Sequence, residues 1–185
     1  MLNRSRILTA AAIATAITML PSAANAASAT ATVNAKVLKP LVMTGGQSID
    51  LGNIITPSTA TFSGTFTVDA AASQTTTFCA AAFTCTGTVK SALFNLQGTN
   101  NANITFNVPT SVTLTLQGAT GTPPTLVLTT KNSIAANSGT GNYTITLPSS
   151  GSPGKDFYVG GSVTVTELTA AGTYQGTFTV TADYQ

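Results

Sequence analysis

A period of two residues governs the end of the chain and constrains its fold more than any other feature. From Gly172 onward, every second residue is glycine, alanine, valine or aromatic, and most residues between them are threonine. Because successive side chains of a strand point to opposite faces, this pattern predicts a long strand with one face on a core. The core side of that strand would carry Gly172, Phe178, Val180 and Tyr184.

The same alternation recurs in short segments along the chain. It predicts strands at residues 30–38, 61–70, 91–98, 103–109, 111–118, 125–130, 142–148 and 157–168, and two more on either side of a turn at Gly45 and Gly46. The close spacing of residues 91–118 suggests a meander. Threonine is the commonest residue, and strong helix formers are scarce. We therefore expect an all-β chain that folds as one antiparallel sandwich or barrel of about ten strands.

The first 26 residues have the organisation of a secretory signal peptide. A basic start with Arg4 and Arg6 precedes an apolar run that ends at Pro21, and small residues follow at positions 24 and 26. The apolar run is short for a bilayer span, which needs about 20 residues. We expect cleavage before Ala27, no retained transmembrane segment, and export to the periplasm, the cell surface or the medium.

The expected mature chain is electrically neutral. The two arginines leave with the signal peptide, so that five lysines and five acidic residues remain, scattered along the sequence. Nucleic-acid binding needs clustered positive charge, and we do not expect it. About 159 residues (185 minus 26) suffice for a single domain with a substantial core.

Catalytic motifs are weak in this sequence. Histidine is absent, which excludes the Ser-His-Asp and Cys-His arrangements and removes the commonest metal ligand. Ser152 and Lys155 have the spacing of a Ser-x-x-Lys motif, but the Pro and Gly between them favour a turn over the helix that this chemistry uses. The few acidic residues are spread out and tryptophan is absent. We expect no enzyme activity, no cofactor and no metal site.

Cys79 and Cys85 are the only cysteines. In an exported protein, an even number of cysteines so close in sequence predicts a disulfide. A loop this short gives about 2 kcal/mol in the chain-entropy model, so the bond would fix a turn more than it would hold the whole fold together.

Two resemblances suggest a role for the terminal strand. Gly172 and the penultimate Tyr184 resemble the C-terminal signature of chaperone–usher pilus subunits. Across nearly the whole mature chain, the sequence is also similar to a secreted bacterial family known as domain of unknown function 4402. That similarity lies in residues 48–53 (SIDLGN), the cysteine pair, residues 157–161 (FYVGG) and residues 172–174. The order of an alternating strand, a short loop and IDLG further resembles pilus subunits of the spore-coat-protein-U type.

The pilus resemblance implies a pilin-like, immunoglobulin-like sandwich over residues 39–185 and a separate N-terminal strand at residues 27–38. Such a strand would add to another copy or a related subunit, and a periplasmic chaperone would hold the subunit beforehand. Its inward side chains would be Ala31, Val33, Ala35 and Val37. The alternative is a self-contained secreted or surface-attached sandwich that binds an unknown ligand, with residues 30–37 paired inside their own chain. Both hypotheses predict the same alternation.

Overall fold

The computed structural model describes residues 27–74, 78–134, 141–149 and 153–185, so the predicted signal peptide lies outside the described residues. The chain divides into two units that meet between Lys36 and Val37. In the described part of the first unit, residues 27–36 form no strand, and the side chain of Val33 is 91% exposed. Val37, at the start of the second unit, is 92% exposed.

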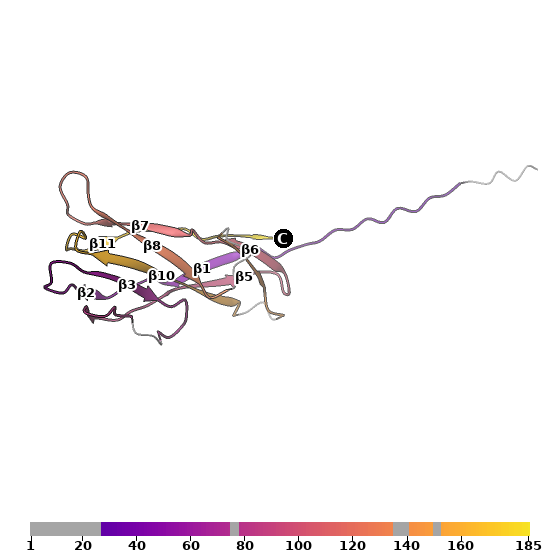
Figure 1. Ribbon diagram of the computed structural model, residues 1–185. Helices are drawn as coiled ribbons and strands as arrows, with labels where there is room; N and C mark the ends of the chain where they lie inside the picture. The colour runs from indigo at the N-terminus through magenta and orange to yellow at the C-terminus, as the bar shows by residue number, and fades with distance from the viewer. Residues whose placement is uncertain (1–26, 75–77, 135–140, 150–152) are drawn as a thin grey trace, which may run out of the picture. The chain divides into compact units, whose positions relative to one another are not determined.

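The second unit is all-β, as predicted (Figure 1). No helix occurs among the described residues. The strands are β1 (Val42–Gln47), β2 (Asn53–Ile55), β3 (Ser63–Val68), β4 (Thr84–Thr86), β5 (Ala92–Gln97), β6 (Asn103–Asn107), β7 (Ser111–Leu116), β8 (Thr125–Asn132), β9 (Asn142–Thr146), β10 (Lys155–Thr166), β11 (Tyr174–Gln175) and β12 (Thr181–Tyr184).

The strands form three antiparallel sheets. The large sheet has the order β1-β5-β10-β8-β7-β11, and β3 also pairs with β10. The small sheet has the order β12-β6-β9, and β2 pairs with β4 in a two-stranded ribbon. β10 organises the large sheet because its first half pairs with β5 and its second half with β3, while β8 lies along its other edge.

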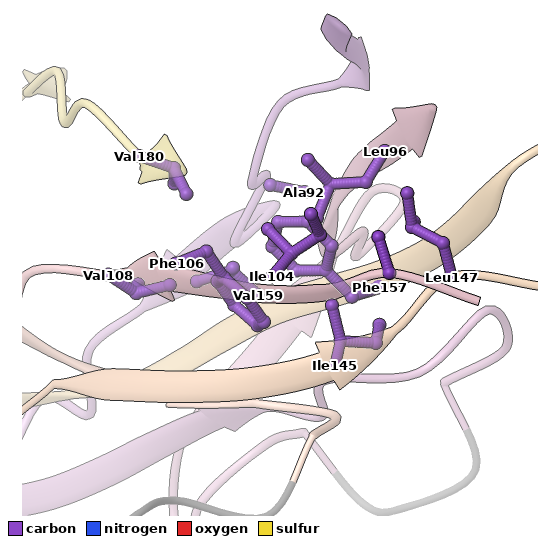
Figure 2. Close-up of a cluster of buried hydrophobic side chains, with 11 residues drawn as sticks. Ala92, Leu96, Ile104, Phe106, Val108, Ile145, Leu147, Phe157, Val159 and Val180 are labelled. Carbon is purple, nitrogen blue, oxygen red and sulfur yellow. The ribbon is translucent and has the colours of Figure 1, made fainter. Parts of the chain in front are cut away.

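A first core lies between the small sheet and the β5–β10 part of the large sheet (Figure 2). Its centre is aromatic: the rings of Phe106 and Phe157 have centroids 4.4 Å apart, and Phe94 stacks on Phe157 at 5.2 Å. Full burial of a side chain of this size contributes about 1.5 to 3 kcal/mol. Around these rings lie the buried side chains Ala92, Leu96, Ala102, Ile104, Val108, Ile145, Leu147, Val159 and Val180.

A second core lies on the inner face of β3, β7, β8 and the second half of β10. Its buried members are Phe66, Val112, Leu128, Val163 and Val165. Among the described strands, none adds a third member to the ribbon that lies over part of this core, and most of the apolar residues packed around the core are only partly buried. The second core is therefore less completely covered than the first.

The outer face of the large sheet explains the abundance of threonine. Thr65 is paired with Thr164, and their hydroxyl oxygens lie 3.0 Å apart. Two residues further along β10, on the same face, Ser162 lies between Thr67 and Thr129. Threonine suits this face because its branched side chain favours strands while its hydroxyl remains in water.

Four details of the predicted strands were wrong. Residues 30–38 are in no strand. Gly45 and Gly46 do not form a turn, because β1 runs through them and its pairing with β5 shifts register there. The segments at residues 91–118 do not form a meander, since β5 and β7 belong to the large sheet and β6 to the small one. The long terminal strand is interrupted: β11 pairs with β7, and β12 pairs with β6.

Candidate functional site

A groove of about 1670 Å³ opens over the second core. One side is formed by residues 45–56, which include the end of β1, the connection to β2 and β2 itself, together with Phe62. The other side is formed by residues 169–178, which lead into and beyond β11. The floor comes from β5, β7, β8 and β10, with the apolar side chains Phe94, Val112, Leu114, Leu126, Leu128, Val163 and Val165.

Both sides of the groove carry strands at sheet edges. β1 and β11 are the two end strands in the order of the large sheet, and both line the groove. β12 is likewise an end strand of the small sheet. An edge strand presents backbone N–H and C=O groups that can pair with another strand. The fold therefore places two edges of its sheets beside one cavity.

The interrupted terminal strand contributes to the edge on one side of the groove. Its pairing with β7 ends at Gln175, and its pairing with β6 begins at Thr181, so residues 176–180 are in no described strand pair. The strand crosses from one sheet to the other at this point. Gly176 permits the crossing, since a Cβ atom there would lie 2.9 Å from Leu114 and closer still to the carbonyl oxygen of Thr113.

The apolar side of the terminal strand faces inward. Val180 is buried in the first core, and Tyr184 packs against that core. Phe178 contacts both cores, and its ring centroid lies 6.0 Å from that of Phe94. Gly172 has a φ of 148°, and a Cβ atom there would collide with Leu116. These four predicted residues therefore lie along the segment that contains β11 and β12, with Phe178 and Gly172 beside the groove.

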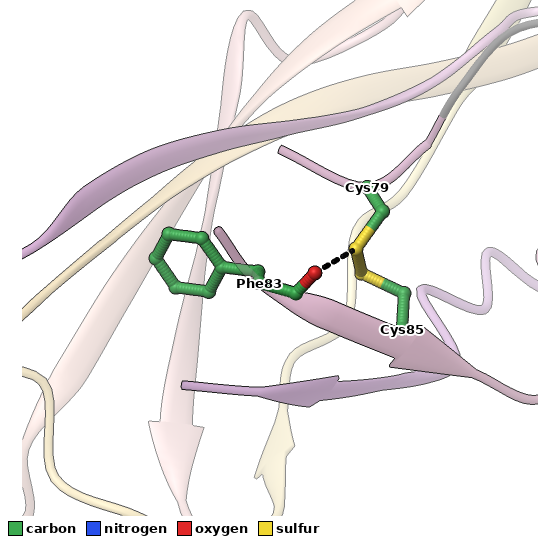
Figure 3. The surroundings of a disulfide bond; sticks show 3 residues. All are labelled: Cys79, Phe83 and Cys85. Carbon is green, nitrogen blue, oxygen red and sulfur yellow. Dashed lines mark hydrogen bonds between the residues drawn. A yellow bond between two sulfur atoms is a disulfide. The ribbon is translucent and has the colours of Figure 1, made fainter. Parts of the chain in front are cut away.

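The predicted disulfide is present behind the opposite side of the groove (Figure 3). Cys79 and Cys85 have Cα atoms 5.7 Å apart, and Cys85 belongs to β4. The sulfur of Cys79 lies 3.4 Å from the carbonyl oxygen of Phe83. The Phe83 ring packs edge-on against Phe66 at 5.0 Å and Phe62 at 5.6 Å, so the cysteine loop covers one side of the second core.

The predicted N-terminal side chains are not buried. Ala31, Val33, Ala35 and Val37 are all exposed, and the sheet strands begin only at Val42. Exposed valines at alternate positions are unusual in a segment without strand partners, because burial of apolar surface is the main gain of folding. Sequence reasoning identified this segment but did not identify the groove floor, since alternation alone cannot show that a core lacks a cover.

No metal-binding arrangement is found in the part of the chain that the structure describes. There, no three His, Cys, Asp or Glu side chains gather in a way that could hold a metal ion. Ser152 lies outside the described residues, and Lys155 is exposed in β10.

The fold defines the chain as an antiparallel β-sandwich protein with a long groove beside its terminal strand. Residues 41–184 match the family model described as domain of unknown function (DUF4402), and the chain belongs to that family. A search of curated proteins finds no match. Within its described residues, the protein has no helix with the length and hydrophobicity needed to cross a membrane.

Proposed function

We propose that this protein is an exported, non-enzymatic subunit of a surface fibre or adhesive layer, in which residues 27–38 of one copy enter the groove of the next. The observation that carries the proposal is the groove itself, which has an apolar floor and a sheet edge on each side. An extended segment that enters the groove would pair with one of these edges. Strand addition of this kind takes affinity from main-chain hydrogen bonds and specificity from alternate side chains.

The exposed N-terminal segment has the properties of the incoming strand. From Ala27 to Val37 its apolar residues recur at every second position and would face the groove floor, while Thr32, Asn34 and Lys36 faced water; only Leu38, at the end of the segment, departs from this pattern. It has no proline before Pro40, and every residue from Ala27 to Lys39 can therefore offer a backbone donor.

The side chains alone are too small to account for a stable assembly. Burial of Val33 and Val37 contributes about 1.5 to 3 kcal/mol each. Association costs at least about 4 kcal/mol in lost translational and rotational freedom. The incoming strand would also cover partly exposed floor and wall residues, among them Leu114, Leu126 and Phe178, and the backbone ladder would supply the remainder.

Before assembly, the same groove would need a temporary cover. An uncovered sheet edge above an apolar floor is a site of unspecific association. A periplasmic chaperone that lends a strand would meet this need, and it is the partner that we propose besides other copies or related subunits.

The second candidate function is a self-contained secreted or surface-attached sandwich whose groove binds a segment of another molecule. The small side chains of Ala31 and Ala35 favour it, because a groove of about 1670 Å³ leaves room for larger ones. The two functions differ in whether the protein's own N-terminal segment is the occupant.

Aspartate substitutions on the two faces of the N-terminal segment distinguish the two candidate functions. Val33→Asp with Val37→Asp should abolish high-mass, detergent-resistant assemblies on gels, because both charges would be buried at the apolar floor. Thr32→Asp with Asn34→Asp adds the same charge to the outward face and should leave assembly intact. Equal assembly by both variants, or a wild-type chain that stays monomeric at high concentration, would contradict the fibre proposal.

A further inference from the structure

β2 lines one side of the groove, and the ribbon that it forms with β4 is not part of either larger sheet. In the order of the described strands, β2 and β4 pair only with each other. Three residue pairs hold them together, from Asn53–Thr86 to Ile55–Thr84. A two-stranded ribbon is at best marginally stable by itself in water. Its position beside the groove therefore depends on how it is attached to the rest of the fold.

Besides the packing of Ile54 and Cys85 against the second core, the ribbon has one attachment near each end. Before β2, Asp50 and Lys90 exchange two backbone hydrogen bonds of 2.9 Å each, which ties the connection between β1 and β2 to the start of β5. Before β4, the loop closed by Cys79 and Cys85 lies over the second core. The backbone N–H of Phe83 donates to Ala80 O at 3.1 Å, so this loop turns tightly.

The cysteine loop fits into a recess on β3. A Cβ atom at Gly64 would lie 2.5 Å from the ring of Phe83 and 2.9 Å from the side chain of Ala80. The absence of a side chain at Gly64 thus makes room for the loop. The disulfide links Cys79, at the start of this loop, to Cys85 in β4. It therefore keeps β4 close to the loop whose Phe83 ring packs on the second core.

The disulfide is linked to the groove through β2: β4 carries Cys85 and pairs with β2, and β2 lines the groove. Cys85 is the register partner of Ile54, and Ile54 lines the groove together with Ile55. A shift of β4 would move Ile54 because the two are paired through their backbones. The same shift would change the spacing between the ribbon and residues 169–178, which is the width available to an incoming strand.

We propose that the Cys79–Cys85 disulfide is a positioning element of the groove, which accepts a strand tightly only while this cross-link holds the ribbon in place. The inference rests on the proposed function, since it concerns the same groove. It assigns the disulfide to strand binding, in addition to the stability that any cross-link contributes.

The test compares the disulfide-bonded chain with a variant that carries Cys79→Ala and Cys85→Ala. Both full-length chains also carry Val33→Asp and Val37→Asp, which keep their own N-terminal segments out of the groove. The probe is a fluorescent peptide of residues 27–38, and its affinity is read from anisotropy. Loss of the cross-link should weaken binding by about tenfold or more. Amide hydrogen exchange should accelerate at residues 53–55 and 84–86 and remain slow in β5 and β10.

Ile145→Val is the control for a general loss of stability. Ile145 is buried in the first core and does not line the groove, so this variant lowers the unfolding midpoint without disturbing the ribbon. It should bind the peptide as tightly as the disulfide-bonded parent. Unchanged affinity in the alanine variant, or an equal loss in the control, would overturn this inference alone. Failure of the disulfide-bonded parent to bind the peptide would overturn the proposed function as well.

Discussion

The hydroxyl of Tyr184 donates a hydrogen bond of 2.7 Å to the carbonyl oxygen of Lys39. The same hydroxyl accepts one of 2.8 Å from the backbone N–H of Thr99, and the Lys39 N–H donates to the Thr99 hydroxyl at 2.7 Å. One side chain of the terminal strand thus anchors the backbone three residues before β1. Tension on an N-terminal segment held by a neighbouring copy would be carried by these bonds.

Tyr184→Phe should remove this anchor and little else. The ring still packs against the first core, while the Lys39 carbonyl and the Thr99 N–H lose a partner. We expect the free energy of unfolding to fall by about 1 to 2 kcal/mol in urea denaturation. Tyr158→Phe is the matched control, because no described residue hydrogen-bonds the Tyr158 hydroxyl, and it should cost less than about 0.5 kcal/mol. An equal effect of the two changes would show that the anchor is not formed.

Phe178→Ala should destabilise the protein by about 3 kcal/mol, the lower end for a phenylalanine because its side chain is only partly buried. The next residue, Thr179, is exposed, and Thr179→Ala should change the unfolding free energy by no more than about 0.5 kcal/mol. Thermal or urea unfolding gives both numbers. Small effects at both positions would mean that the register of the terminal strand is wrong.

Gly160→Ala should lower the free energy of unfolding far more than Gly45→Ala. At Gly160, a Cβ atom would lie 2.8 Å from the backbone of Asp69 and Ala70 and still closer to the carbonyl oxygen of Val68. These are backbone atoms that cannot turn aside, so we expect a loss of about 3 kcal/mol. At Gly45 the nearest side-chain atom is 4.0 Å away, and unfolding midpoints should barely change. Comparable losses would contradict the close approach of residues 68–70 to β10.

Strand positions were predictable where one face of a strand is buried. β3, β5, β6 and β10 were found by alternation, because burial on one face gives a strand its period of two. β4 was missed because it has only three residues, in a ribbon that covers a core without extending a sheet. The sequence predicted a turn at Gly45 and Gly46. Adjacent glycines are also compatible with a strand that shifts its register, as β1 does there.

The groove could not be predicted from the sequence in the same way. It depends on which sheet each strand joins, and the short loops around β6 are compatible with a meander or with alternation between two sheets. The terminal strand was predicted as continuous because its side-chain pattern is continuous. Its backbone nevertheless changes partner between Gln175 and Thr181, and this change leaves the edge of the groove free.

Processing and oxidation are checked by the intact mass of the exported protein. The polypeptide should begin at Ala27, because the signal peptide is expected to end at residue 26, and its mass should be about two daltons below that of the reduced chain. Denaturation without reduction should expose no thiol to a labelling reagent. Retention of residues 1–26, or two reactive thiols, would contradict export into an oxidising compartment.

Amide hydrogen exchange at residues 176–180 tests strand acceptance most directly. The full-length chain with Val33→Asp and Val37→Asp is measured alone and with an excess of a peptide of residues 27–38. A peptide with the same two substitutions serves as the control. If the native peptide pairs with the free edge, exchange in residues 176–180 should slow by at least about tenfold, and the substituted peptide should have no effect. Unchanged exchange at saturating native peptide would contradict the claim that this groove accepts a strand from another copy.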